Sequence, residues 1–294
     1  MKRLDKSELI FKILAYTLTT FFAICCLYPF IYTVSAMFSS RDAINAGIVV
    51  LLPVDFQIDA FISVIEDKQF WICYANTLFL TFYGTIYSML ISILGGYVLS
   101  KKKLLFRKQL NFLLVFTMWF SAGMIPTYLN YKATRDVLEG VGIFDDKWLV
   151  VIAMGISAFN IIILRNAFEA VPKEIEEAAV VDGANEFQIL TNVYIPMSKA
   201  AIATVGLFYG ISRWNGYFWA ATMIRSIIQQ PLQVYIKYKL DEVKGYDIAD
   251  ITTPYAPESI IYGMIFCAMV PILLIYPYIQ KYFAVGVNLG GVKE

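Results

Sequence analysis

Residues 69–100 read QFWICYANTLFLTFYGTIYSMLISILGGYVLS and contain no Asp, Glu, Lys or Arg. A helix needs about 20 mostly apolar residues to cross the hydrocarbon core of a bilayer, and this stretch is long enough to do so. The same charged residues are missing from four other stretches: 13–40, 109–131, 148–164 and 259–280. One more apolar stretch, from about Ala200 to Ile224, is interrupted only by Arg213. The pattern predicts an all-α membrane protein.

Six transmembrane helices fit these stretches within a single transmembrane domain, residues 1–294. They are predicted at about 13–38, 76–100, 110–129, 148–167, 200–222 and 259–279. The composition agrees, because 59% of the residues are hydrophobic and 16% are charged, whereas soluble proteins average about 25% charged residues. A net charge of +1 gives no reason to expect nucleic-acid binding. No catalytic residue or metal site is predicted, because the chain has no histidine and its cysteines lack metal-ligand spacing.

Lys and Arg in the loops indicate how the chain is oriented in the membrane. If the N-terminus is cytoplasmic, the inside segments hold more Lys and Arg than the outside segments. The strongest cluster comprises Lys101, Lys102, Lys103, Arg107 and Lys108, which we interpret as a topological anchor beside anionic lipid. We therefore expect a multi-pass protein of the plasma (inner) membrane with both termini in the cytoplasm.

The cytoplasmic segment 165–199 reads RNAFEAVPKEIEEAAVVDGANEFQILTNVYIPMSK and is longer than a connector needs to be. Pro172 suits the first turn of a helix, and Gly183 suits its end. A second helix is predicted from about Asn185 until Pro196 stops it. Its apolar side is built from Phe187, Leu190, Val193 and Tyr194.

Two uses are open for this pair of helices. The first helix is acidic and its apolar face, around Ala178 and Ala179, is small. An amphipathic helix of that kind suits an anionic membrane surface poorly. Docking into a groove of a soluble partner is favoured, because small residues allow two backbones to approach closely.

The same segment resembles the EAA loop of binding-protein-dependent ABC importer permeases. That pattern is EAA, three residues, G, nine residues and I-x-L-P. Here Glu177-Ala178-Ala179 is followed at these spacings by Gly183 and by Val193-Tyr194-Ile195-Pro196. Val193 and Ile195 are conservative departures from the pattern. Asp182-Gly183-Ala184 is similar to the version found in sugar importers.

Two other segments resemble carbohydrate permeases. The stretch Phe208–Phe218, with Trp214-Asn215 inside it, is similar to the fifth helix of permeases of the maltose-importer kind. The tail from Tyr276 to Lys293 resembles a subset that imports larger oligosaccharides. The resemblance covers about residues 9–294.

This resemblance implies a type I ABC importer permease fold whose first loop helix is a coupling helix seated on a separate ATPase. The residues that it assigns to this coupling are Glu177, Ala178, Ala179, Asp182, Gly183 and Pro196, with Glu177 expected to make the charged contact. The chain has no G-x-x-x-x-G-K-[ST] phosphate loop. We therefore expect ATP–Mg on the partner and no cofactor in this chain.

The implied partners follow from the same family. They are two copies of the ABC ATPase, a second and related but different permease subunit, membrane lipid, and an extracellular or periplasmic solute-binding protein. Two interpretations of the outer segment 223–258 are equally open: it receives the binding protein, or it is a simple solvated loop. Two are also open for the tail 286–294: it contacts the ATPase, or it is an extended mobile chain.

A path for sugars needs hydrogen-bonding groups and aromatic faces. The candidates in or beside the spans are Trp119, Ser157, Asn160, Arg213, Trp214, Asn215 and Tyr217. The competing interpretation is that Ser and Asn bond between helices and that Trp and Tyr lie at the membrane interface. For Arg213, pairing with an acidic residue of an outer loop is favoured over snorkelling and over contact with an anionic sugar.

The leading hypothesis is a permease subunit of an ATP-driven importer for a carbohydrate, in particular an oligosaccharide. An ABC permease for an amino acid, polyamine or phosphonate is the nearest alternative. A secondary transporter or channel is disfavoured, because the spans hold no acidic residue and the chain shows no internal repeat. A membrane enzyme is weaker still without histidine.

Overall fold

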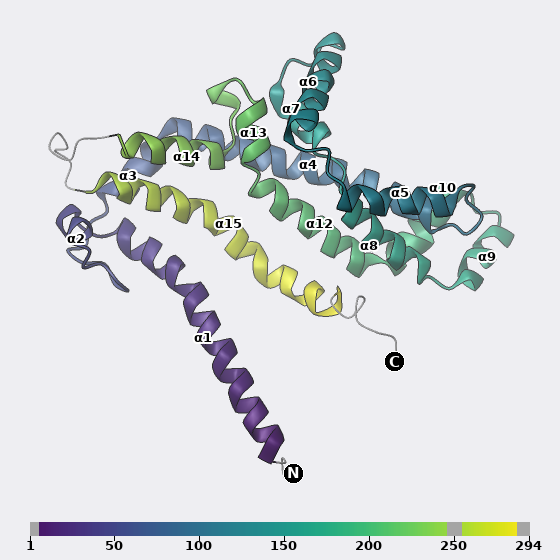
Figure 1. Ribbon diagram of the computed structural model, residues 1–294, viewed down its shortest axis with the longest axis horizontal. Coiled ribbons are helices and arrows are strands. Elements are labelled where there is room, and N and C mark those ends of the chain that lie inside the picture. The colour runs from purple at the N-terminus through teal and green to yellow at the C-terminus, as the bar shows by residue number, and fades with distance from the viewer. Residues whose placement is uncertain (1–5, 246–254, 287–294) are drawn as a thin grey trace. The chain divides into compact units, whose positions relative to one another are not determined.

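The computed structural model describes residues 6–245 and 255–286, and its regular structure in these ranges is entirely helical (Figure 1). The α-helices are α1 (Lys6–Met37), α2 (Arg41–Asn45), α3 (Asp59–Glu66), α4 (Lys68–Ser100), α5 (Arg107–Trp119), α6 (Met124–Gly140), α7 (Asp146–Ala153), α8 (Ala158–Glu169), α9 (Lys173–Val181), α10 (Glu186–Ile189), α11 (Ile195–Met197), α12 (Lys199–Trp214), α13 (Phe218–Met223), α14 (Leu232–Val243) and α15 (Pro257–Gly286). A π-helical turn spans Leu190–Tyr194, and a 3₁₀ turn spans Ile227–Gln229. The predicted all-α class is confirmed.

Between three and six segments are long and apolar enough to cross a membrane. Among the described residues, α1, α4 and α15 each contain an uninterrupted candidate span. The other three candidates are bent pairs of helices. The bend is 116° between α5 and α6, 50° between α7 and α8, and 86° between the run 186–197 and α12.

Short breaks therefore interrupt three of the predicted spans. The break after α5 ends at Gly123, whose φ of +86° lies in a region that favours glycine. The break after α7 ends at Ser157, whose hydroxyl accepts the amide of Asn160 and starts α8. The span expected at 200–222 divides after Trp214 into α12 and α13. That the stretches 110–129, 148–167 and 200–222 each cross the membrane as one span stays a prediction, and the run 186–197 belongs to the loop predicted at 165–199.

The chain divides into two compact units: residues 1–71 with 236–271, and residues 72–235 with 272–294. In the first unit, no residue in the apolar window of α1 is buried. Only the end of α1 joins a small core, where Tyr32 packs edge-on against Tyr262 at 5.6 Å and Ala36 is fully buried.

The second unit has two apolar cores. One surrounds Leu164 of α8 and includes residues of α4, α12 and the run 186–197, and the other surrounds Leu149 of α7. Figure 1 shows α8 and α12 side by side in this unit. Helix α4 reaches α8 at Gly96, where an added Cβ would lie 3.0 Å from Leu164 Cβ and 3.1 Å from the amide of Arg165. Glycine at this position is what allows the two backbones to approach so closely.

Candidate functional site

The loop 165–199 forms a helix, a turn and a second helical run (Figure 1). Pro172 precedes the first residue of α9. At the other end Gly183 has a φ of +79°. The amides of Gly183 and Ala184 donate to the carbonyls of Val180 and Ala179, both at 3.0 Å, which is the Schellman pattern of a helix end. The helix start and end predicted from Pro172 and Gly183 are confirmed.

The second helical run departs from the prediction in two ways. Its start is well defined, because Asn185 and Gln188 exchange side-chain and backbone hydrogen bonds in a capping box. Leu190 and Tyr194 are buried as expected, but Phe187 is 70% exposed and does not join them. The Phe187 side chain lies on the surface of the helical run that follows α9 in the sequence.

The other departure concerns Pro196. The run continues through Pro196 to Met197, so the predicted stop is one residue early. Proline in an α-helix lacks a donor and collides with the carbonyl four residues earlier. The π-helical turn just before it widens the backbone, and the Ile195 amide donates five residues back, to Leu190. Pro196 thus occupies the first turn of a new short helix, where its missing N–H costs nothing.

The helix α9 lies at the surface of its unit, because no residue of this helix is buried. Glu177, Ala178, Asp182 and Gly183 are exposed. Among the residues that the structure describes, the Glu177 side chain has no hydrogen-bond or ion-pair partner. Ala179 is half-buried against the core around Leu164, and Pro196 is exposed.

A cluster of charges and aromatic rings ties α9 to the end of α4, and we call it the Lys101 cluster. Lys101 Nζ lies 2.5 Å from Glu176 Oε1 and 3.5 Å from Glu186 Oε2. The same ammonium lies over the rings of Tyr97 and Tyr194, 4.3 and 4.7 Å from their centroids. Tyr194 donates its hydroxyl to Glu176, and Tyr97 donates to Glu186. Lys101 is therefore bound by protein groups, and the anchor role of the basic cluster stays a prediction.

Both charges at the centre of the Lys101 cluster are stabilised. Burial by itself raises the pKa of Glu176, but hydrogen bonds from Lys101 and Tyr194 outweigh this and hold the pKa below its usual 4.5. Burial lowers the pKa of Lys101, but the hydrogen bond to Glu176 and the surrounding negative charge hold the pKa above 10.5. The stabilisation from Glu176 is present above pH 4.5 and lost in acid, and that from Lys101 is lost in strong base. The pair is ionised throughout the physiological range.

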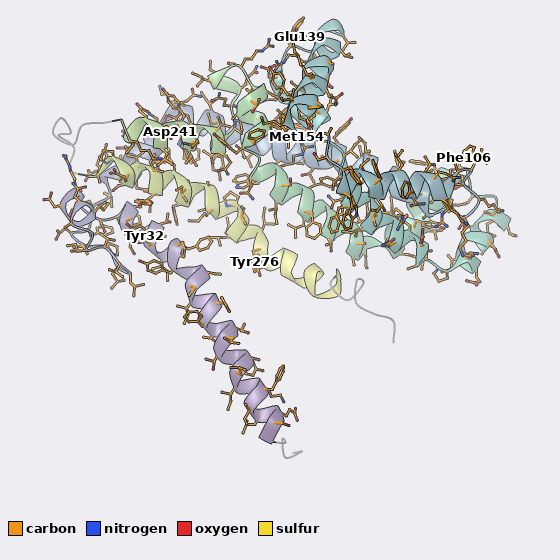
Figure 2. The ribbon with its side chains drawn as sticks, viewed as in Figure 1. Tyr32, Phe106, Glu139, Met154, Asp241 and Tyr276 are labelled. Atoms are coloured by element: carbon orange, nitrogen blue, oxygen red, sulfur yellow. The ribbon has the colours of Figure 1, made fainter. Side chains whose placement is uncertain are left out.

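Arg213 is buried at the end of α12, with 6% of its surface exposed. Its Nη1 donates to the carbonyl of Val150 at 2.8 Å. Its Nη2 donates to the carbonyls of Val151 (3.2 Å) and Met154 (2.7 Å) and to Ser88 Oγ (3.1 Å). These carbonyls belong to the last turn of α7 and to the break that follows it, where Met154 is labelled in Figure 2. The predicted pairing with an acidic side chain is wrong, because the acceptors are neutral.

A helix end explains this arrangement. The last four carbonyls of a helix have no partner within it, and the negative end of the helix dipole attracts a cation. Gly84 of α4 provides the room, since an added Cβ would lie 3.0 Å from Arg213 Nε. Arg213 thus donates hydrogen bonds to backbone carbonyls at a helix break inside a candidate span.

The other solute-path candidates occupy different environments. Trp214 is buried and packs edge-on against Tyr74 at 5.8 Å, and Asn160 is also buried. The remaining candidates are more accessible: Trp119 and Tyr217 are 81% and 39% exposed, Asn215 is exposed and Ser157 is half-buried. Solute contact by any of these residues, and by Arg213, stays a prediction. The tail 287–294 and part of the outer segment, 246–254, lie outside the described residues.

A second charged network was missed by sequence reasoning. Asp146 at the start of α7 is 6% exposed and accepts the backbone amide of Arg225 at 3.0 Å. Arg135 Nε lies 3.2 Å from its carboxylate, and Arg135 Nη2 donates to the Met223 carbonyl. Arg225 also pairs with Glu139, near the end of α6 (Figure 2), at 2.9 Å. The pair Asp145-Asp146 before an apolar run signals a helix start, but it does not reveal partners from distant segments.

The described residues hold no group of three or more Cys, Asp or Glu side chains placed to bind a metal ion. The residues around Lys101, Arg213 and Asp146 hold helix ends and loops together. Nothing in their arrangement resembles a nucleophile with a general base.

Comparison with known proteins identifies the family. Residues 79–288 match the family described as "Binding-protein-dependent transport system inner membrane component". The chain is 35% identical to the "Polygalacturonan/rhamnogalacturonan transport system permease protein YtcP" of Bacillus subtilis (strain 168), over 97% of this chain and 98% of that protein.

Two solved structures are also similar. One is a chain of a bacterial ABC transporter involved in the import of the acidic polysaccharide alginate, with a TM-score of 0.85 and 41% identity over 96% of this chain and 100% of that chain. The other belongs to an alginate ABC transporter in complex with a periplasmic protein bound to alginate pentasaccharide. At 16% identity and a TM-score of 0.63 over 93% of each chain, it shows the fold alone.

The family model covers more than half of the chain, and the similarity to the first two proteins extends over nearly all of it. The chain therefore belongs to the binding-protein-dependent ABC importer permeases, multi-pass proteins of the cell membrane that work with a solute-binding protein and a separate ATPase subunit.

Proposed function

We propose that the oligosaccharide carried by this importer is acidic and that the exposed surface of α9 seats on the ATPase. The observation that carries the substrate proposal is the 41% identity, over 96% of the chain, to a chain of a bacterial ABC transporter involved in the import of the acidic polysaccharide alginate. The 35% identity to a permease named for polygalacturonan and rhamnogalacturonan supports it independently. Polygalacturonan and alginate are both chains of uronic acids, so their shared chemistry is a carboxylate on the sugar ring.

Uptake by the complete importer tests the substrate class. With the permeases, the ATPase and the cognate binding protein in proteoliposomes, we expect oligogalacturonate or alginate oligosaccharides to accumulate at least about tenfold faster than maltopentaose. A site built to bind a carboxylate loses this interaction with a neutral sugar and leaves its own polar groups unpaired. Faster uptake of maltopentaose would overturn the proposal of an acidic substrate. Uptake of spermidine or glutamate instead would favour the non-sugar alternative.

The docking proposal rests on the geometry of α9. This helix exposes Glu177, Ala178 and Asp182, ends in a tight Schellman turn and buries no residue of its own. A short helix with small residues on its exposed side fits a groove of a soluble protein. Two ATPase subunits present two grooves, so a second permease is required, and we propose a related but different chain.

The same proposal sets the orientation. If α9 faces the ATPase, the loop 165–199 is cytoplasmic. Four crossings precede this loop and two follow it in the six-span interpretation, so both termini are then cytoplasmic as well. The basic residues near Lys101, which lie on the same side, agree with this orientation.

Charge reversal at Glu177 tests the docking surface. We expect Glu177→Lys to reduce solute uptake at least about tenfold, because an unfavourable charge in a docked interface costs about 2–5 kcal/mol. Glu177 is exposed, so the permease itself should remain folded and inserted. The measurements are co-purification of the ATPase, ATP hydrolysis and uptake in one preparation.

Glu258→Lys is the matched control, since it reverses an exposed carboxylate at the start of α15, on the predicted outer face. It should leave co-purification of the ATPase unchanged, because the predicted outer face does not meet the ATPase. If Glu177→Lys behaves like this control, α9 is not seated on the ATPase through Glu177.

A further inference from the structure

The Lys101 cluster joins three elements that are far apart in the sequence. Lys101 directly follows α4, Glu176 lies in α9, and Glu186 opens α10. The Lys101 side chain is 20% exposed and that of Glu176 is 26% exposed, so this ion pair is largely shielded from water. An ion pair of this kind resists screening by salt better than a surface pair does.

The packing around α9 makes these polar contacts unusually important for the helix. Most helices are held by the burial of an apolar face, but α9 buries no residue, and Val180 and Val181 are 56% and 86% exposed. Ala179 alone is packed against the core as a partly buried residue of this helix. The Glu176 carboxylate, with its bonds to Lys101 and Tyr194, is therefore the main side-chain attachment of α9 to the rest of the unit.

The two neighbouring carboxylates of α9 have different environments. Consecutive residues in an α-helix point about 100° apart. Glu176 contacts Lys101 and Tyr194, whereas Glu177 is exposed on the surface proposed to meet the ATPase. One short helix thus has a partner-facing carboxylate next to one that is bound to the membrane domain.

We propose that Lys101 is a positioning residue through which movement of α9 is passed to α4. The proposal rests on the proposed seating of α9 on the ATPase and goes further, because it names the contact that carries the motion onward. When the ATPase displaces α9, the Glu176–Lys101 pair and the two tyrosine rings around the ammonium draw the end of α4 with it. Without this contact α9 follows the ATPase while α4 stays behind, and ATP is hydrolysed without transport.

Lys101→Met tests this in the assembled importer, with the ATPase, the second permease and the binding protein present. We expect the ratio of solute transported to ATP hydrolysed to fall at least about fivefold, which is the lower end of typical couplings between sites. ATPase co-purification and hydrolysis should continue. The matched control is Lys102→Met, which removes the same charge from the adjacent residue, whose side chain is exposed, and should leave the ratio unchanged.

A double-mutant cycle keeps the test decisive if Lys101→Met also weakens assembly. Glu176→Gln and the double variant Lys101→Met/Glu176→Gln are measured in the same way. If the pair acts as a unit, the double variant loses no more coupling than either single variant. Independent losses that add, or a Lys101→Met ratio equal to that of Lys102→Met, would overturn the proposal.

The outcome also separates this inference from the docking proposal. If Glu177→Lys uncouples the importer but Lys101→Met does not, α9 docks on the ATPase and passes its motion through another contact. If Glu177→Lys has no effect while Lys101→Met uncouples the importer, the docking surface is wrong and the attachment of α4 still stands.

Discussion

Replacement of Arg213 by methionine is expected to destabilise the permease by at least about 3 kcal/mol and to abolish assembly of the importer. Four hydrogen bonds from the guanidinium would be lost, to Ser88 and to the carbonyls of Val150, Val151 and Met154. Each bond from a charged donor is worth about 1.5–3 kcal/mol when its partner is then left unsatisfied. Removal of the buried cation recovers several kcal/mol of desolvation cost, and the Val150 carbonyl keeps a long bond from the Met154 amide at 3.4 Å, but we expect the loss of the other bonds to outweigh this gain.

Two variants around the same contact calibrate that expectation. Arg213→Lys keeps the charge, but its single ammonium cannot reach acceptors spread across the end of α7, and we expect an intermediate loss. Gly84→Ala leaves Arg213 in place and places a Cβ 3.0 Å from its Nε, which should cost about 1–3 kcal/mol through overpacking. Thermal unfolding of the purified complex ranks the three variants.

The opposite result has a clear meaning. An Arg213→Met importer that assembles with normal thermal stability and loses only the transport of acidic oligosaccharides would show that the guanidinium serves the solute. The helix-break role would then be wrong.

Replacement of Asp146 by alanine is expected to cost about 3–5 kcal/mol, the usual penalty for leaving one partner of a buried ion pair alone. Arg135 decides this magnitude, because its side chain is 15% exposed and pairs with the Asp146 carboxylate at 3.2 Å. The loss also frees the backbone amide of Arg225, which Asp146 accepts at 3.0 Å. Thermal unfolding and limited proteolysis near α6 measure the effect.

Arg225→Gln is the matched control for Asp146. Its side chain is 62% exposed, and an exposed ion pair contributes about 0–1 kcal/mol. The hydrogen bonds from Arg225 to Asp146 and Glu139 raise the pKa of Arg225, so this side chain is charged at any working pH. Its contribution to stability is therefore limited by its exposure to water and not by its protonation. Equal losses from Arg225→Gln and Asp146→Ala would contradict this account.

Local signals in the sequence predicted the helix–turn–helix of the loop. Pro172 and Gly183 affect the backbone only within one helical turn of their own positions, so their roles do not depend on the rest of the fold. The exposure of Glu177 and Ala178 followed from the same short pattern. The apolar stretches likewise located the long helices, because membrane crossing depends on length and composition.

Contacts between distant segments could not be predicted in this way. Lys101 and Glu176 are 75 residues apart, and a basic loop beside a predicted span gave no sign that one of its lysines is paired. The break after α7 contains no proline, and Gly155 is its clearest sequence signal. Arg213 fits there because Gly84 leaves space in another helix, a fact that appears only when the helices are packed.

The way in which Arg213 holds the end of α7 also affects how this region can change in evolution. Three of its four acceptors are backbone carbonyls, which are present whatever side chains stand at 150, 151 and 154. Those positions can therefore vary as far as the apolar core allows without removing the contact. The positions that cannot vary independently are Arg213, which supplies the donors, Gly84, which leaves room for them, and Ser88, whose side chain is the fourth acceptor. A pairwise search for covarying side chains would therefore detect Arg213 with Gly84 and Ser88 and would miss α7, the helix whose end they support.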